Sequence, residues 1–244
     1  MKLKMNIESI IKAITPSVVK IQTQYGYGTG FIFWENQELC CIATANHVIE
    51  PANQEGWEQP ILITQSNGKS IRVSPHDRWV APNLNSGDSA AILVRKEDFH
   101  MPDSLIKIQE ETAMPIGGKV GWLGYPSIVP NDIVQPSFFS GVISNILPTV
   151  DQYVIDGVSI HGVSGGPVFY LPEDGSDFFF IGSISSYHVN RVPVGENTES
   201  WPGLLAAHNI SVFEPVIEHL KTLEEAQSQK DENETVDVPR PPRK

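Results

Sequence analysis

The stretch HGVSGGPVF, residues 161–169, places Ser164 among three glycines. Gly162, Gly165 and Gly166 leave the backbone free to reach positive φ, so the segment can turn sharply and bring its own N–H groups near the hydroxyl. A serine nucleophile beside an oxyanion hole requires this kind of backbone. Taken alone, the pattern fits equally well a tight turn in which serine and glycine supply only turn chemistry.

Short strand-like segments dominate the chain on both sides of this stretch. After residue 17, β-branched and aromatic runs such as GTGFIFW, DSAAILV and FFFIGSISS are separated by Gly, Pro, Asn or Asp. Such runs without interleaved helices predict an antiparallel sandwich or barrel rather than βαβ units. The 244 residues can form two small barrels, which we place at about 17–100 and about 115–213.

Helical spacing occurs only near the two ends of the chain. Apolar residues at positions 7, 10, 11 and 14 predict a short N-terminal helix that ends before Pro16. Apolar residues at 212, 216, 217, 220 and 223 predict a C-terminal helix over about 212–226. The remaining segment, 227–244, is polar, charged and proline-rich, and we expect it to be a disordered tail.

The composition indicates which kinds of partner the protein can bind and in which compartment it works. The net charge is −12, so the chain lacks the bulk basic surface that nucleic-acid binding demands. No apolar run approaches the roughly 20 residues that span a bilayer, and the N-terminus does not have the pattern of a secretory signal. Cys40 and Cys41 are adjacent and poorly placed for an ordinary disulfide, which favours a reducing compartment. We therefore expect a cytoplasmic protein that binds neither nucleic acid nor membrane.

A serine hydroxyl needs a base to take its proton and a third group to orient that base. His47 ends the strand-like run IATANHVI, and Asp88 opens the run GDSAAILV. The order His47, Asp88, Ser164 is the order of two-barrel chymotrypsin-like proteases. His161 is the other histidine near the serine, but its place in the same turn favours a position at the rim of the cleft.

Three motifs in this order resemble those of trypsin-like serine proteases, above all the protease domain of the HtrA (Deg) family. The segments ITPSVVKIQT, GYGTGFIF and IATANHVI resemble that family's opening, DSAAILV its aspartate strand, and GVSGGPVF its Gly-Asn-Ser-Gly-Gly-Pro segment. The resemblance covers about residues 14–213. It implies an all-β fold of two six-stranded antiparallel β-barrels within a protease domain at 1–226, with short N-terminal and C-terminal helices. We expect no PDZ domain after residue 213.

The resemblance also implies roles for individual residues. Ser164 would be the nucleophile, His47 the general base and Asp88 the group that orients it, while the N–H groups of Gly162 and Ser164 would form the oxyanion hole. Val163 departs from the family, which has Asn there, and from digestive enzymes, which have Asp. We expect Val163 to leave the oxyanion loop held by packing alone, so that an activating protein partner or substrate would order it.

Substrate-binding residues follow from counting back from Ser164 and from the strand SISSYH. Val158 would lie at the base of the primary pocket, and an apolar base disfavours Lys or Arg before the scissile bond. The predicted substrate-binding residues are Val158, Ser159, His161, Ser185, Ser186 and Tyr187. We expect a protein or peptide substrate and neither cofactor nor metal.

The interpretation is therefore a serine endopeptidase that works through an acyl-enzyme. One alternative is a protease-fold binding or regulatory module whose oxyanion hole is inactive. Another is a hydrolase of small esters, but that activity needs the serine on a strand-to-helix elbow, and GGPVF reads as a strand.

Overall fold

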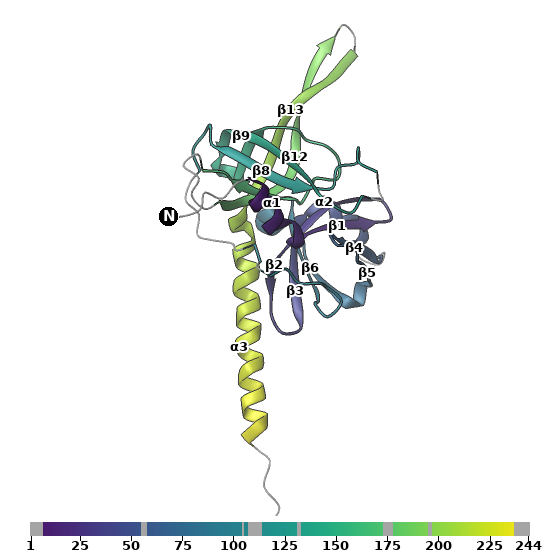
Figure 1. Cartoon of the computed structure of the whole chain (residues 1–244), viewed down its shortest axis with the longest axis vertical. Coiled ribbons are helices and arrows are strands. Elements are labelled where there is room, and N and C mark those ends of the chain that lie inside the picture. Colours follow the sequence, from purple (N-terminus) through teal and green to yellow (C-terminus); the bar gives the residue numbers. More distant parts are fainter. Residues whose placement is uncertain are drawn as a thin grey trace, which may run out of the picture.

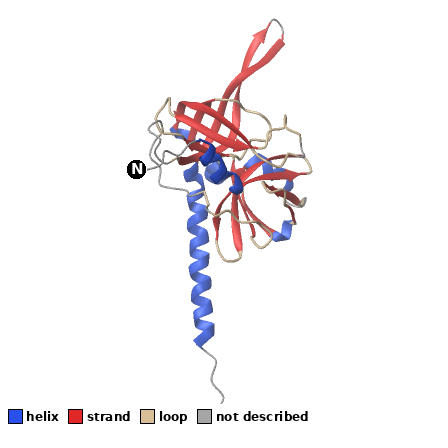
Figure 2. Ribbon diagram, in the orientation of Figure 1, coloured by secondary structure: helices blue, strands red, loops and turns tan. Residues whose placement is uncertain are grey.

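Two β-structured units lie side by side, and one long helix projects away from them (Figure 1). The computed structural model describes residues 7–54, 58–103, 105–106, 114–130, 133–172, 178–194 and 197–236. Strands make up most of both units, and helices lie mainly at the two ends of the chain (Figure 2).

The first unit is a seven-stranded antiparallel sheet with strand order β5-β4-β1-β2-β3-β7-β6. Its core consists mainly of buried Val, Ile, Cys and Ala side chains. Such β-branched and small apolar residues suit the faces of a half-buried sheet. The strands are β1 (Val18–Thr23), β2 (Gly26–Glu35), β3 (Leu39–Ala45), β4 (Ile61–Gln65), β5 (Ser70–Val73), β6 (Arg78–Ala81) and β7 (Ser89–Arg95).

The first unit differs from the predicted six-stranded barrel in strand number and closure. Its edge strands β5 and β6 are consecutive in the chain and joined by a 3₁₀ turn at Pro75–Asp77. Proline has no N–H to donate to a ladder, so pairing stops at this turn. The Arg78 guanidinium instead donates to the carbonyl of Val73 at 3.3 Å, which links the two edges through a side chain.

The second unit is a closed barrel of six strands in the order β10-β13-β12-β11-β8-β9, as predicted. The long hairpin of β12 and β13 extends beyond the barrel wall (Figure 1). The strands are β8 (Lys119–Gly124), β9 (Ser137–Leu147), β10 (Gln152–Asp156), β11 (Pro167–Tyr170), β12 (Phe179–Val194) and β13 (Asn197–Asn209). The two-barrel class is thus confirmed, with the first barrel open between its edge strands β5 and β6 and the second barrel closed.

Three α-helices complete the described fold: α1 (Ile7–Ile14), α2 (Asn46–Ile49) and α3 (Glu214–Val236). Helix α1 ends where the apolar spacing and Pro16 predicted. Helix α3 continues past the predicted end at 226 through residues that we assigned to a disordered tail. Glu, Ala, Gln and Lys in this segment favour a helix by intrinsic propensity, without an apolar face to bury. Residues 237–244 lie outside the described residues.

A single apolar cluster joins the two barrels and both terminal helices. It contains Phe31 from β2, Tyr125 after β8 and Phe169 from β11, and Ile10 and Leu220 bring α1 and α3 against it. Phe213 lies at its centre with no exposed surface, 6.3 Å from the ring of Phe31. This cluster fixes the barrels relative to each other and therefore fixes the groove between them.

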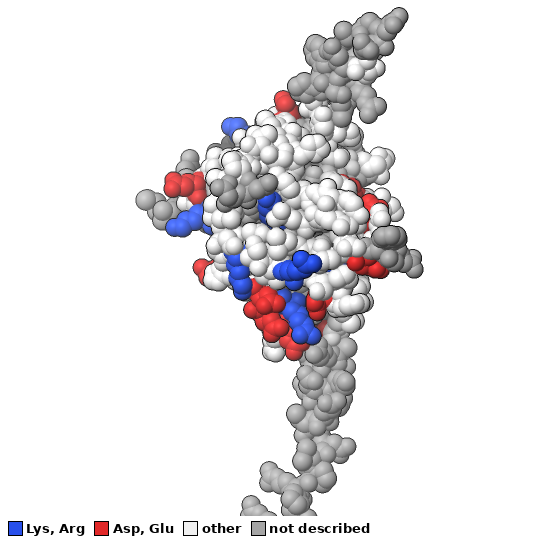
Figure 3. Space-filling model, turned by 90° about the vertical axis from the view of Figure 1, so that its right-hand side faces the viewer, with Lys and Arg blue, Asp and Glu red and all other residues white. Residues whose placement is uncertain are grey.

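The charged surface is mixed on the face shown in Figure 3, where acidic and basic side chains lie next to one another rather than in a basic patch. No helix in the described ranges is both long and apolar enough to cross a membrane.

Candidate active site

His47 and Asp88 come together through the pairing of β3 with β7. The register places Ala45 opposite Ser89, so the residues that follow β3 meet the residue that precedes β7. The N–H of Asn46 donates to the Asp88 carbonyl at 3.1 Å and begins the short helix α2, which presents His47. The strand pairing alone therefore brings the histidine to the carboxylate.

Both oxygens of the Asp88 carboxylate accept hydrogen bonds from His47. Nδ1 of the ring lies 2.7 Å from Oδ2, and the His47 main-chain N–H donates to Oδ1 at 2.9 Å. The ring proton is thereby held on Nδ1, which leaves Nε2 free to accept a proton. The hydrogen bond to Asp88 raises the pKa of His47 above its ordinary value, against an opposing effect of burial.

Ser164 lies in a turn whose positions 162 and 165 can be occupied only by glycine. Gly162 has φ of 96° and Gly165 has φ of 84°, both in the left-handed region. A Cβ on Gly162 would lie 2.1 Å from the carbonyl oxygen of Tyr125, and a Cβ on Gly165 would lie 2.1 Å from that of Thr29. Glycine is thus required for conformation and for space at both positions.

The consecutive N–H groups of residues 162–166 fall into two sets. Those of Val163, Gly165 and Gly166 donate to main-chain carbonyls at 2.6 to 3.2 Å. Those of Gly162 and Ser164 donate to no protein group within the described part of the chain. Two N–H groups, one of them that of the serine itself, are therefore available to an acceptor from outside.

The expectation that packing alone holds this loop is wrong. Val163 does pack in the second barrel, with 1% of its surface exposed. The loop also receives hydrogen bonds from Thr29 of the first barrel, whose hydroxyl donates to the Gly162 carbonyl at 2.6 Å and whose N–H donates to the Ser164 carbonyl at 2.8 Å. The sequence motif GTG carries no sign of these contacts, because they form only when the barrels dock.

A cavity of about 1070 Å³ brings the predicted residues onto one surface. It is lined by His47, Ser164 and all six predicted substrate-binding residues: Val158, Ser159, His161, Ser185, Ser186 and Tyr187. The Ser164 hydroxyl makes no hydrogen bond to the His47 ring among the interactions of the described residues. Val158 is 56% exposed, so it lies on an open wall and not at the bottom of a closed pocket.

Sequence reasoning missed a second histidine next to Asp88. His208 of β13 is 4% exposed, and its Nε2 lies 3.3 Å from the Asp88 main-chain N–H and 3.0 Å from Nε2 of Gln152. Desolvation lowers the pKa of His208, and two facing donors keep its Nε2 unprotonated. Its pairing partners come from the other barrel and from β10, so the local sequence AAHN offers no signal for this role.

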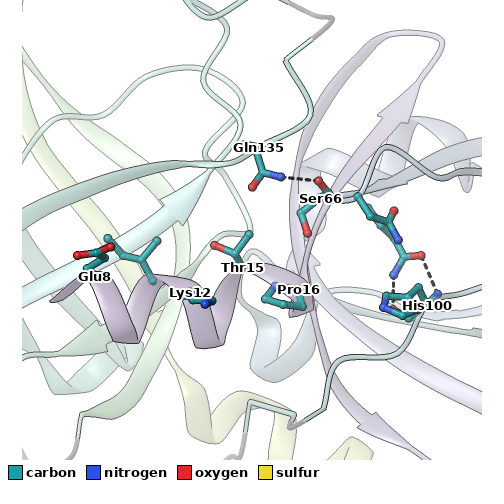
Figure 4. A pocket seen from close by; sticks show the side chains of 10 residues that line it. Glu8, Lys12, Thr15, Pro16, Ser66, His100 and Gln135 are labelled. Atoms are coloured by element: carbon teal, nitrogen blue, oxygen red, sulfur yellow. Dashed lines mark hydrogen bonds between the residues drawn. The ribbon is translucent and has the colours of Figure 1, made fainter. Parts of the chain in front are cut away.

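A second cavity, of about 510 Å³, lies between α1 and the first barrel (Figure 4). Two of its polar side chains are engaged: Gln135 donates to the Ser66 carbonyl at 2.6 Å, and Gln65 makes two bonds to the main chain of His100. None of the described residues that line it is a histidine hydrogen-bonded to a carboxylate, whereas His47 in the larger cavity is bonded to Asp88. We therefore place the candidate active site in the larger cavity.

No group of three or more His, Cys, Asp or Glu side chains among the described residues could hold a metal ion. The larger cavity presents the Ser164 hydroxyl and the His47 imidazole, and the imidazole is hydrogen-bonded to the Asp88 carboxylate. Beside the hydroxyl, the N–H of Ser164 has no acceptor among the described residues.

Comparisons with known proteins agree on the fold. No family model and no curated protein matches the sequence. The crystal structure of Deg5 matches with a TM-score of 0.54 and 19% identity, over 75% of this chain and 87% of that chain. The inactive form of the Rv3671c protease matches with a TM-score of 0.52 and 21% identity, over 81% and 86%.

A serine-to-alanine mutant of Rv3671c from M. tuberculosis H37Rv, also in an inactive form, matches with a TM-score of 0.52 and 20% identity, over 81% of this chain and 84% of that one. At identities this low the likeness concerns architecture. The chain has the trypsin-like two-barrel fold.

Proposed function

We propose that this protein is a serine endopeptidase in which His47, Asp88 and Ser164 form the catalytic triad. The observation that carries the proposal is the placement of an oriented imidazole and a serine on one cavity wall, with the N–H groups of Gly162 and Ser164 unbonded to any described residue. The fold shared with the Rv3671c protease and the HtrA-like motifs in the sequence support the same class.

In the first half of the reaction, Ser164 Oγ attacks the peptide carbonyl carbon while His47 Nε2 takes the hydroxyl proton. The carbonyl oxygen becomes an oxyanion, which accepts hydrogen bonds from the N–H groups of Gly162 and Ser164. The C–N bond then breaks, and His47 returns the proton to the leaving amine. The products are a free amine and an acyl ester on Ser164.

In the second half, water attacks the ester carbonyl and gives one proton to His47 Nε2. The C–O bond to Ser164 breaks, the serine recovers its proton from His47, and a carboxylic acid leaves. Asp88 stays ionised throughout and stabilises the imidazolium that forms in each half. In many hydrolases the bond between nucleophile and base is long or absent without substrate and forms in the complex. We propose that the hydrogen bond from Ser164 to His47 forms in this way when substrate binds.

We propose an extended protein segment as substrate, held by pairing with the strand at 185–187. The exposed apolar side chains on the cavity wall, Ile128, Val158 and Tyr187, favour uncharged residues beside the scissile bond. Asp156 is the one carboxylate among the described lining residues, and it is exposed, so solvent screens its attraction for a basic residue.

A fluorophosphonate probe tests the proposal directly. The wild-type protein should be labelled at Ser164, identified by mass spectrometry of the adduct, and should cleave a mixed peptide library after apolar residues. Ser164→Ala should lose both activities, whereas Ser140→Ala, which removes an exposed hydroxyl from another residue of the cavity lining, should keep the label. A folded wild-type protein without label or cleavage would contradict the proposal and favour a protease-fold binding module.

A further inference from the structure

Thr29 lies where the first barrel touches the serine loop of the second. It sits in β2 between Gly28 and Gly30 and has no exposed surface. A Cβ on Gly28 would lie 3.1 Å from the Ser164 carbonyl oxygen and 2.4 Å from a methyl group of Val48. The glycine before Thr29 therefore permits a close approach of β2 to the loop.

Every hydrogen-bonding group of Thr29 near the loop has a defined partner. Its N–H donates to the Ser164 carbonyl at 2.8 Å, and its hydroxyl donates to the Gly162 carbonyl at 2.6 Å. The hydroxyl oxygen also accepts from the N–H of Tyr125 at 3.0 Å, and the Thr29 carbonyl accepts from the Thr44 hydroxyl at 2.7 Å. Because Tyr125 N–H can only donate, the hydroxyl proton of Thr29 is committed to Gly162.

These bonds complete the anchoring of four consecutive carbonyls in the loop. The carbonyl of His161 accepts from Ser127 N–H at 2.7 Å, and that of Val163 accepts from Gly166 N–H at 2.9 Å. The two others, at positions 162 and 164, are the ones that Thr29 holds. In a trans peptide the N–H points opposite to the carbonyl of the preceding residue, so anchored carbonyls also fix the N–H directions.

The two free N–H groups are thus set by neutral hydrogen bonds. The N–H of Gly162 shares its peptide with the anchored His161 carbonyl, and the N–H of Ser164 shares its peptide with that of Val163. Rotating either N–H away from the cleft would break one of these two bonds. Thr29 holds the neighbouring peptides, 162–163 and 164–165, and so resists the backbone rotation that would accompany such a change. Val163, which precedes the serine, has no charge to form an ion pair that could order the loop.

We propose that Thr29 is a positioning residue that keeps the Gly162 and Ser164 N–H groups directed into the cleft, so the oxyanion hole is formed before any substrate or partner binds. This inference rests on the proposed protease function. Thr29 would order the loop around Ser164 through neutral hydrogen bonds. An ion pair next to the serine, which Val163 cannot form, is not needed. Control of the activity then has to act on access to the cleft and not on loop order.

Two substitutions at Thr29 distinguish the contribution of its hydroxyl from that of its side-chain volume. Thr29→Val keeps the volume and the main-chain N–H but removes the bond to Gly162, whereas Thr29→Ser keeps the hydroxyl. We expect Thr29→Val to reduce kcat and the fluorophosphonate labelling rate about 10²-fold, as loss of one oxyanion donor does, with KM within about threefold. Thr29→Ser should remain within about threefold of the wild type.

Thr64→Val is the matched control. Thr64 is in the same barrel and is 8% exposed. Among the described residues its hydroxyl bonds only to that of Ser70, at 2.9 Å, on the β4–β5 pair away from the loop. A similar fall in melting temperature for both valine variants, with loss of kcat only in Thr29→Val, supports the inference. Equal kcat in Thr29→Val and the wild type would overturn it.

Hydrogen–deuterium exchange of the peptide that covers 160–166 gives a readout independent of catalysis. Thr29→Val should exchange faster there, and Thr29→Ser and Thr64→Val should exchange like the wild type. Unchanged exchange in Thr29→Val would overturn the inference even in a protein that shows no hydrolysis. Absence of labelling in the wild type, with faster loop exchange in Thr29→Val, would instead contradict the proposed function and leave the loop-ordering role standing.

Discussion

At the scale of the residue, Asp88 decides the protonation state of His47. The hydrogen bond at 2.7 Å favours the charged imidazole and raises its pKa above 6.5. The proposed base works only when it is neutral, so kcat/KM should fall as pH falls through that raised pKa. A kcat/KM profile whose acid limb coincides with the His47 pKa from NMR titration would agree. An acid limb well below 6.5 would contradict the assignment.

Asp88→Asn should lower the pKa of His47, because the carboxylate charge and its acceptor oxygen are lost. The ring also loses the tautomer that leaves Nε2 free, and kcat should fall about 10⁴-fold with the fold intact. Asp156→Asn, which removes another carboxylate near the cavity, is the control and should leave both the pKa and kcat nearly unchanged. NMR titration of His47 and initial-rate measurements check the two effects separately.

Alanine substitutions at Gly165 and Gly68 distinguish two costs: the strain of a positive φ, and the clash of a new Cβ with its neighbours. Both have positive φ, but a Cβ on Gly68 meets nothing within 4 Å, whereas one on Gly165 meets the Thr29 carbonyl oxygen at 2.1 Å. Gly68→Ala should cost about 1 to 2 kcal/mol of the free energy of unfolding. Gly165→Ala should cost more than about 4 kcal/mol, measured by urea titration. Equal costs would mean that the loop can move away from β2.

At the scale of the element, helix α3 is attached through the turn that precedes it. Phe213 packs 5.5 Å from the Phe33 ring and is fully buried in the cluster between the barrels. Phe213→Ala should reduce the free energy of unfolding by about 3 to 5 kcal/mol. Leu223→Ala, on helix α3 itself and 50% exposed, should change it by less than about 0.5 kcal/mol. Similar losses for both variants would contradict this account of the attachment.

Strands with β-branched runs could be predicted, and strands without them could not. β3 and β7 consist mainly of Val, Ile, Ala and Cys, and they overlap the runs IATANHVI and DSAAILV, which the sequence predicts as strands. β6 has four residues, none of them buried, and much of β13 carries polar residues, Pro and Gly. Their strand state depends on pairing with β7 and β12, which supply the ladder that their own sequences do not indicate.

At the scale of the whole molecule, the shared apolar cluster should make the two barrels unfold together. Phe31 of the first barrel and Phe169 of the second belong to the same buried cluster, to which α1 and α3 also contribute residues. Urea unfolding followed by far-UV circular dichroism and by tryptophan fluorescence should give coincident curves. Two separated transitions would contradict this, because each barrel would then be stable alone.

The sequence by itself determined the all-β class, the glycine turn around Ser164 and the order of His47, Asp88 and Ser164, because these depend on local propensity and on short motifs. The contacts of Thr29 with Gly162 and of His208 with Asp88 join residues 133 and 120 positions apart, and only the docked barrels create them. Hydrogen bonds across such distances require a particular strand register and barrel orientation. Those are set by burial of the common core, which no local pattern encodes.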